Sequence, residues 1–312
     1  MRTILLPTTL EEPVDLPAGW RSVPYDPALP LPAFASDAEV LVVWGNRRAS
    51  LAEAAERLTS LRWVACLAAG TDAVEEAGFP AHVQVTSGRG LHDGPVAEHT
   101  LALVLACARR VPDMVRSQDE RRWASELGGV QKVHDTAFRT LAGAHVVVWG
   151  FGSIAARLAP LLGALGARVT GVARSAGERA GVPVVTPDAL PDLLPGADVL
   201  IGILPATAAT RHAIGRTMLA ALPSHAVVVN VGRGSTLDED ALLDAVRTRR
   251  LAAAALDVFD REPLPASSPL WAEPRVLVSP HAAGGRPQHA GAFLTAALRT
   301  YDAGEELPNL VG

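Results

Sequence analysis

The most informative stretch of this 312-residue chain is AHVVVWGFGSIAARLAPLLGALGARVTGVARS, residues 144–175. Its β-branched run over 146–149 predicts a short buried strand. A helical pattern over 154–165 follows and is closed by Gly166, and residues 168–173 predict a second strand. Strand, helix and strand in this order form a βαβ unit, which places the two strands parallel in one sheet.

The turn between the first strand and the helix carries the pattern Gly-x-Gly-x-x-Ala. Gly150 allows the tight turn, Gly152 lets the backbone approach a pyrophosphate, and Ala155 is small enough for close packing of helix and strand. The free N–H groups and the positive dipole end at the start of the helix favour phosphate. A plain tight turn in an α/β sheet is the alternative, and we expect dinucleotide binding.

The end of the second strand bears on the choice between NAD and NADP. An acidic residue there holds the ribose 2′-hydroxyl of NAD, but this chain reads Arg174-Ser175 and has no carboxylate before Glu178. A guanidinium beside a hydroxyl suits a 2′-phosphate. We expect NADP. NAD, tolerance of both cofactors, and an Arg174 that only points to solvent are the open alternatives.

Strand and helix patterns alternate through the rest of the chain, which predicts parallel, doubly wound sheets. One helical pattern, 238–250, starts at Asp238, a residue type that caps helices. A long helix or helix pair is expected over 94–119. The other expected strands are 3–7, 40–45, 62–67, 83–87, 198–205, 226–232, 252–259 and 275–279.

The expected fold class is α/β, with two Rossmann-like domains built on doubly wound parallel sheets. A flavodoxin-like substrate domain is expected over 1–95 and is completed by 286–312. A dinucleotide-binding domain is expected over 96–285. The length of the chain fits two domains better than one.

Composition argues against several classes of protein. The net charge is −5 without a long basic stripe, and no 18-residue uncharged apolar run exists, so we expect neither nucleic-acid binding nor a membrane span. Lys132 is the only lysine and lies outside any Gly-Lys-Ser/Thr pattern, which argues against a P-loop. Cys66 and Cys107 lie in apolar surroundings and no signal peptide is expected, so we expect a cytoplasmic protein.

Three ionisable side chains follow strands whose carboxyl ends meet at one edge of the predicted sheet. They are Arg233 in NVGRG, Glu262 in LDVFDREPLP and His281 in SPHAAGG. Open α/β sheets bind ligands at this edge. Taken singly, His281 could fill a turn, and Arg233 and Glu262 could form a surface ion pair.

These motifs, with AGTDAV (69–74) and VAEHTLAL (96–103), resemble the D-2-hydroxyacid dehydrogenase family over nearly the whole chain. The resemblance implies that Arg233, Glu262 and His281 are catalytic. His281 as an imidazolium would protonate the oxygen of a 2-oxo acid while its carbon receives a hydride from a nicotinamide. Glu262 would keep the ring charged and oriented, and Arg233 would hold the substrate carboxylate.

The resemblance also implies contacts with substrate and cofactor. Backbone N–H groups of Ala69 and Gly70 would bind the substrate carboxylate, and Asp257 would accept a hydrogen bond from the nicotinamide carboxamide. Together with the residues argued above, the expected cofactor-binding set is Gly150, Gly152, Ser153, Ile154, Arg174, Ser175, Leu204, Pro205, Thr210, Val231, Gly232, Arg233, Asp257, His281 and Gly284. The expected substrate set is Ala69, Gly70, Arg233 and His281, and no metal site is expected. Of the other histidines considered, His82, His92, His99 and His134, none has a comparable setting, and His99 is expected to be structural.

The expected function is an oxidoreductase that reduces a glyoxylate- or hydroxypyruvate-like 2-oxo acid to the D-2-hydroxy acid with NADPH or NADH. Formate dehydrogenases of this superfamily carry glutamine in place of Glu262, and phosphite dehydrogenases carry lysine in place of Ala69, so neither activity is expected. The alternative is a cofactor-binding sensor without turnover, similar to the transcriptional corepressors that use this fold.

The substrate's side chain and the oligomeric state are less defined. Trp44 and the arginines at 47, 48 and 89 are candidates for the pocket around that side chain, and three arginines would suit a second anionic group unless they are solvated. The resemblance implies a homodimer joined through the nucleotide domain, with the stretch 96–125 and Trp123 as its arm.

Overall fold

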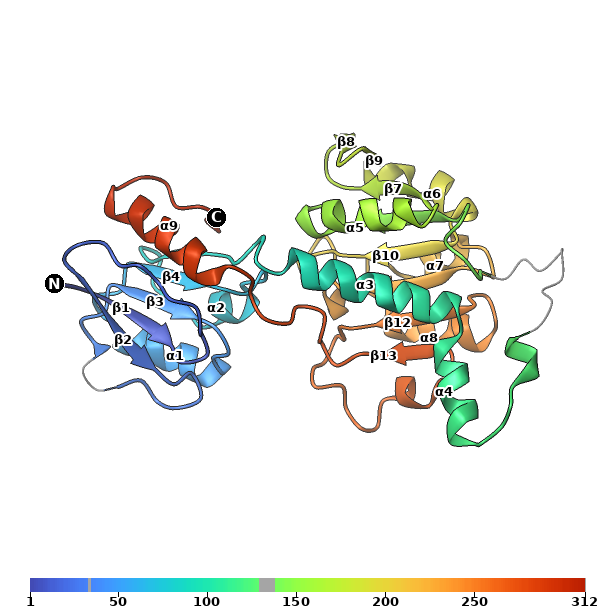
Figure 1. Ribbon diagram of the computed structural model, residues 1–312, viewed down its shortest axis with the longest axis horizontal. Coiled ribbons are helices and arrows are strands. Elements are labelled where there is room, and N and C mark those ends of the chain that lie inside the picture. The colour runs from blue at the N-terminus through green and yellow to red at the C-terminus, as the bar shows by residue number, and fades with distance from the viewer. Residues whose placement is uncertain (33–34, 129–137, 312) are drawn as a thin grey trace. The chain divides into compact units, whose positions relative to one another are not determined.

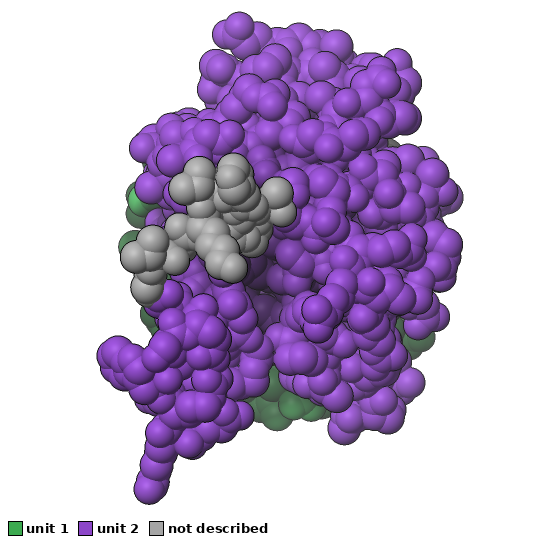
Figure 2. Space-filling view, turned by 90° about the vertical axis from the view of Figure 1, so that its right-hand side faces the viewer, with its two compact units in different colours: residues 1–92, 286–312 green, residues 93–285 purple. Residues whose placement is uncertain are grey.

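The computed structural model describes residues 1–32, 35–128 and 138–311, so Lys132 and His134 lie outside the described residues. Two compact units divide the chain, Met1–His92 with Arg286–Gly312 and Asp93–Gly285 (Figure 2). The sequence analysis expected the domain boundaries after residues 95 and 285. In the structure the chain passes between the two units after residues 92 and 285. Which unit binds substrate and which binds cofactor stays a prediction.

The first unit is a parallel sheet with helices on both faces (Figure 1). Its strands are β1 (Arg2–Pro7), β2 (Trp20–Tyr25), β3 (Val40–Val43), β4 (Trp63–Cys66) and β5 (Gln84–Thr86), and its helices are α1 (Arg48–Arg57), α2 (Asp72–Glu76) and α9 (Ala290–Asp302). The strand order is β2-β1-β3-β4-β5, which is the flavodoxin-like order, in agreement with the expected fold class.

Residues on opposite sides of this sheet belong to two separate cores. Leu51 of α1 and Val74 of α2 pack in one core with Leu41. Leu294 of α9 packs in the other core with Trp63. The last helix of the chain therefore covers one face of a sheet whose strands all come from the first 86 residues.

Strand β2 is not predicted by the sequence analysis. Its segment WRSVPY contains Arg21, Ser22 and Pro24 and is buried only at its two ends. It lies at the edge of the sheet, where a proline that cannot donate to the ladder is tolerated. The hydrophobic pattern that marks a central strand is therefore missing.

The second unit contains an eight-stranded sheet in the order β13-β12-β11-β10-β6-β7-β9-β8 (Figure 1). Its strands are β6 (His145–Trp149), β7 (Arg168–Val172), β8 (Gly177–Arg179), β9 (Val182–Val185), β10 (Val199–Gly202), β11 (Val227–Asn230), β12 (Ala253–Leu256) and β13 (Val276–Val278). Its helices are α3 (Asp93–Ala108), α4 (Val111–Asp119), α5 (Ser153–Ala164), α6 (Leu190–Leu193), α7 (Arg216–Ala221) and α8 (Glu239–Arg247), with short 3₁₀ turns at Ser125–Leu127, Pro187–Ala189, Leu194–Gly196, Gly234–Thr236 and Pro269–Ala272.

Both faces of this second sheet are covered, which explains why its strands are continuous hydrophobic runs. Val146 and Val148 of β6 enter the core beneath α3 and α5. Val147 and Trp149 of the same strand enter the core on the other face, with residues of α7 and α8. The expected βαβ unit over 144–175 is confirmed as β6, α5 and β7.

The expected parallel sheet carries one antiparallel pair, at its edge. Strand β8 runs antiparallel to β9, and neither strand of this hairpin is predicted by the sequence analysis. The connecting residues Ala180 and Gly181 both have positive φ, 52° and 71°. Two consecutive positive φ angles form the tight turn that joins antiparallel strands, whereas parallel strands need a longer crossover.

The expected helix over 94–119 is a helix pair, α3 and α4. The break falls at Arg110, whose φ of 54° is left-handed and cannot continue α3. Pro112 at the start of α4 suits the first turn of a new helix. None of the helices formed by the described residues combines the length and apolar character needed to cross a membrane.

Helix α8 provides a test of local structure, because Asp238 caps it as expected and accepts a hydrogen bond from the Ala241 N–H at 2.9 Å. We predict that Asp238→Ala destabilises the protein by about 1 kcal/mol, since the N–H loses its acceptor. Thermal unfolding followed by circular dichroism measures the change. The matched control is Asp240→Ala, in the same turn, and an equal loss in this control would contradict a capping role.

Candidate active site

The candidate site lies at the carboxyl edge of the second sheet, where β6, β10, β11, β12 and β13 end in loops. Arg233 follows β11, Glu262 follows β12 and His281 follows β13. These three strands are neighbours in the sheet. The order of the strands therefore brings loops that are far apart in sequence to adjoining positions.

Glu262 and His281 are hydrogen-bonded to each other. The Nδ1 atom of His281 lies 2.6 Å from Oε2 of Glu262. The other carboxylate oxygen of Glu262 accepts the Phe259 N–H at 2.9 Å, so the glutamate is held by its own loop. The imidazole is exposed and presents its Nε2 edge away from the glutamate.

This contact favours the charged form of both groups. The hydrogen bond that His281 donates to the carboxylate of Glu262 raises the pKa of His281 above 6.5, and it outweighs burial and the charge of Arg233, which lower this pKa. Burial opposes ionisation of Glu262, but the hydrogen bonds from His281 and from Phe259 outweigh burial and lower its pKa. The contact therefore favours an imidazolium paired with a carboxylate.

Arg233 lies on a turn that the side chain of Asn230 stabilises with two hydrogen bonds. The amide of Asn230 donates to the carbonyl oxygen of Arg233 at 3.1 Å and accepts the Gly232 N–H at 3.2 Å. The charge of Arg233 lowers the pKa of both His281 and Glu262, which places it near the pair. Asn230 belongs to the quoted NVGRG motif, but sequence reasoning assigned it no role.

The backbone of the turn after β11 contacts the backbone of the loop after β12 at Gly234. A Cβ atom at Gly234 would lie 1.8 Å from the carbonyl carbon of Phe259, a distance no side chain tolerates. Only glycine lets these two segments touch. Arg233 and Glu262 are thereby carried on loops in direct contact.

The loop that carries His281 is tied to a buried carboxylate. Asp257 is 1% exposed. Its Oδ1 accepts the hydroxyl of Ser279 and the Ala282 N–H, and its Oδ2 accepts the Ala283 N–H at 3.0 Å. We expected Asp257 to accept from the nicotinamide carboxamide, and here its oxygens already accept three donors that position the loop.

His99 joins this network from helix α3. Its Nε2 lies 2.9 Å from the hydroxyl of Ser279 and 3.3 Å from Oδ1 of Asp257. The residue was expected to be structural, and these contacts give it a definite position behind the His281 loop. The sequence signal was its place in the VAEHTLAL motif, but nothing local indicates its partners.

The glycine turn before α5 fits a phosphate group. Gly150 has φ of 101°, and a Cβ there would lie 2.3 Å from the carbonyl oxygen of Ile203. A Cβ on Gly152 would meet nothing within 4 Å, so this position faces open space at the start of a 12-residue helix. Ser153 and Ile154 present backbone N–H groups there, while the Ser153 hydroxyl donates to Asp93 at 3.1 Å.

The other expected cofactor-binding residues lie on the same edge in different settings. Arg174 and Ser175 are exposed directly after β7. The hydroxyl of Thr210 donates to the carbonyl of Pro205 at 2.6 Å and thereby shapes its own loop. Leu204, Val231 and Gly232 are buried at strand ends, and Gly284 is half-buried after His281.

Ala69 and Gly70 belong to the first unit, in the loop between β4 and α2. Ala69 is exposed and Gly70 is half-buried. Of the arginines considered for a substrate pocket, Arg48 forms an ion pair with Glu76. The indole of Trp44 packs against the ring of His92, with centroids 5.3 Å apart.

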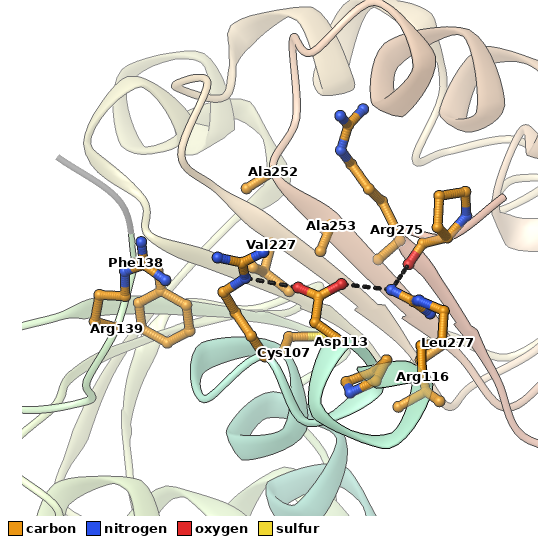
Figure 3. Close-up of a pocket in the computed structure, with 14 residues that line it drawn as sticks. Cys107, Asp113, Arg116, Phe138, Arg139, Val227, Ala252, Ala253, Arg275 and Leu277 are labelled. Carbon is orange, nitrogen blue, oxygen red and sulfur yellow. Dashed lines mark hydrogen bonds and ion pairs between the residues drawn. The ribbon is translucent and has the colours of Figure 1, made fainter. Parts of the chain in front are cut away.

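A separate pocket of about 400 Å³ lies at the amino ends of β11, β12 and β13, the opposite edge of the sheet (Figure 3). Its described lining includes none of the expected site residues. Arg110 and Arg116 both donate to the carboxylate of Asp113, at 2.6 and 2.5 Å. Burial raises the pKa of Cys107 in this pocket to about 12, so its thiol is a poor nucleophile.

The described residues include no group of three or more His, Cys, Asp or Glu side chains arranged to hold a metal ion. The described edge carries an imidazole, a guanidinium and a glycine turn, which are groups able to donate a proton, bind an anion and bind a phosphate.

Comparison with known proteins gives matches over most of the chain. Residues 101–283 match the family model described as D-isomer specific 2-hydroxyacid dehydrogenase, NAD binding domain. The glyoxylate reductase of Aeropyrum pernix is 35% identical over 256 residues, which cover 80% of this chain and 76% of that protein. The glyoxylate/hydroxypyruvate reductase A of Klebsiella pneumoniae is 44% identical over 123 residues, 39% of each protein.

A solved structure matches both units. It is the D-isomer specific 2-hydroxyacid dehydrogenase from Xanthobacter autotrophicus Py2 in complex with NADPH and MES. The TM-score is 0.79 at 30% sequence identity, and the match covers 100% of this chain and 98% of that one.

The pairing of Glu262 with His281 can be tested without any substrate. We predict that Glu262→Gln lowers the pKa of His281, because a neutral amide replaces the charged acceptor that raises this pKa most. An NMR titration of the His281 ring signal, assigned with a His281→Gln spectrum, measures the shift. Asp260→Asn is the control, since its carboxylate does not bond to the ring. An unchanged His281 pKa in Glu262→Gln would contradict the pairing.

Proposed function

The chain belongs to the D-isomer specific 2-hydroxyacid dehydrogenase family, and we propose that it reduces a small 2-oxo acid to the D-2-hydroxy acid with NAD(P)H. The observation that carries this proposal is the 2.6 Å contact between Glu262 and His281 at the carboxyl edge of the sheet. A protonated ring at this position is a proton donor for a developing alkoxide.

Each of the three ionisable residues has a separate task. His281 donates its proton to the carbonyl oxygen of the 2-oxo acid. Glu262 favours the protonated imidazole and fixes its orientation through Nδ1. Arg233 binds the substrate carboxylate and polarises the carbonyl. The nicotinamide, when bound, supplies the hydride.

The glycine turn and its helix hold the cofactor's phosphates. Gly152 faces open space, and Ser153 and Ile154 offer backbone N–H groups at the positive end of α5. Asp257 and the residues bordering the site, among them Leu204, Val231 and Gly284, flank the nicotinamide half. NADP is the proposed cofactor with NAD as the alternative, supported by Arg174 and Ser175 after β7 and by the NADPH complex of the relative from Xanthobacter.

Glyoxylate and hydroxypyruvate are the proposed substrate types, supported by the names of the relatives from Aeropyrum and Klebsiella. A second anionic group on the substrate has less support, because Arg48 is neutralised by Glu76 and only Arg47 and Arg89 remain for it. A cofactor-binding sensor without turnover is not favoured, since the proton-donating pair is complete and the relatives named here are reductases.

Homodimer formation is proposed through α4 and the segment that follows it. Val111, Met114 and Val115 are spaced to share one helix face and are 42%, 42% and 51% exposed, and Trp123 is 91% exposed. Exposed apolar side chains clustered in this way mark contact surfaces. A cytoplasmic location is proposed as well, supported by two free cysteines.

The activity is tested by a steady-state screen of 2-oxo acids with NADPH and NADH. We predict turnover of glyoxylate or hydroxypyruvate that falls by about 10²- to 10⁴-fold in His281→Gln, because the proton donor is removed. Nucleotide binding, measured by fluorescence, separates loss of chemistry from loss of cofactor. Tight nucleotide binding by the wild-type protein without turnover of any acid would support the sensor instead.

The pKa of His281 predicts the direction in which kcat/KM changes with pH. Reduction needs the protonated ring, so kcat/KM falls as pH rises through the His281 pKa, which lies above 6.5. In Glu262→Gln this pKa is lower, and the alkaline limb of the pH–rate profile moves to lower pH. A limb that stays in place in Glu262→Gln would rule out His281 and Glu262 as the acid pair.

The dimer is tested by light scattering on the intact chain. We predict a mass of two 32.6 kDa chains for the wild-type protein and a dimer dissociation constant at least about tenfold weaker in Trp123→Ser, since large aromatic residues dominate interfaces. Leu165→Ser removes an exposed apolar side chain at the C-terminal cap of α5 as a control. A monomeric wild-type protein would end this proposal.

A further inference from the structure

The hairpin of β8 and β9 carries the only ionisable residues that follow Arg174 before residue 186, and its register orients them. In the antiparallel ladder, Arg179 stands opposite Val182 and Glu178 stands opposite Pro183. Directly opposed residues share one face of a sheet. Val182 is buried and Pro183 is exposed, so Arg179 lies on the covered face and Glu178 on the outer face.

The guanidinium of Arg179 joins two segments of the nucleotide-binding edge. Its Nη1 donates to the carbonyl of Phe151 in the glycine turn at 3.1 Å. Its Nη2 donates to the carbonyl and to the hydroxyl oxygen of Ser175, at 2.9 and 2.6 Å. In βαβ nucleotide sites the glycine turn and the end of the second strand are the segments that flank the adenosine ribose.

These contacts set the hydrogen-bonding character of the site. The hydroxyl oxygen of Ser175 accepts from Arg179, so its own O–H is left to donate to another group. Arg174 is exposed beside it. A ribose 2′-hydroxyl needs an acceptor here, whereas a 2′-phosphate needs donors and positive charge. Within residues 173–185, which the structure describes in full, the one carboxylate is Glu178, and it lies on the other face.

We propose that Arg179 is a specificity-determining residue, which orients Ser175 and, with Arg174, forms the binding site for the 2′-phosphate of NADP. The inference rests on the proposed dehydrogenase function and deepens it by assigning the cofactor preference to a residue of the hairpin. The sequence analysis predicted NADP from Arg174 and Ser175 at the end of β7. Arg179 lies further along the chain, in β8.

The test compares nucleotides that differ only in the 2′-phosphate. Dissociation constants for NADPH and NADH are measured by nucleotide fluorescence, and those for 2′,5′-ADP and 5′-AMP by calorimetry. In Arg179→Gln we expect affinity for NADPH and 2′,5′-ADP to fall about 10- to 100-fold, the effect of losing a charged hydrogen-bond donor to phosphate. Affinity for NADH and 5′-AMP is expected to change less than about threefold.

Two further variants control for charge and for structure. Glu178→Gln alters the adjacent residue on the outer face and is expected to leave all four affinities unchanged. Arg179→Lys keeps the charge without the two-pronged donor and is expected to give an intermediate NADPH affinity. Equal weakening of NADPH and NADH in Arg179→Gln would assign the residue to loop structure alone and overturn the proposal, as would unchanged binding of both.

The outcomes also separate this inference from the proposed reaction. Wild-type protein that binds NADH as tightly as NADPH overturns the 2′-phosphate site, while turnover of a 2-oxo acid with either nucleotide leaves the dehydrogenase function standing. Wild-type protein that prefers NADPH through Arg179 but turns over no 2-oxo acid supports the site and contradicts the reaction.

Discussion

The carboxylate of Asp257 is almost fully buried, and it accepts hydrogen bonds from Ser279, Ala282 and Ala283. A buried charge is tolerated only when such donors replace water. The donors here belong to the loop that carries His281, whose own N–H bonds to the Asp257 carbonyl at 2.8 Å. The need to satisfy one carboxylate thus holds His281, the proposed proton donor, at the end of β13. The ion pair with Glu262 depends on this placement.

The same edge depends on close backbone contact between neighbouring loops. The turn after β11 touches the loop after β12 at Gly234, and the turn after β6 touches the loop after β10 at Gly150. Side chains at these points would separate the loops by the width of a methyl group or more. The strand order of the sheet supplies the neighbours, and the two glycines set how closely their loops approach. Precise placement of charged groups on loops is possible because the loops support each other.

Sequence reasoning was strongest where a local pattern carries the information. The βαβ unit, the cap at Asp238 and the grouping of Arg233, Glu262 and His281 at one edge all follow from periodicity and strand ends. Features that depend on distant partners were missed. His99 meets Ser279 across 180 residues of chain, and nothing near either residue indicates the other. The edge strand β2 and the hairpin β8–β9 lack the continuous hydrophobic runs of central strands, so Arg179 had no predicted position. Lys132 and His134 lie outside the described residues, so the expectations for them stay predictions.

Helix α9 completes a core that begins at the first strand of the chain, because Leu294 and Leu298 pack with Ile4 and Trp63. On the ribosome, the strands of the first unit emerge long before this helix does, and the whole second unit is synthesised in between. Domains generally fold as units during synthesis. The inserted unit is thus able to fold while one apolar face of the first sheet still awaits its cover. Until α9 is synthesised, this apolar face is exposed, and transiently exposed apolar surface makes a chain prone to aggregation.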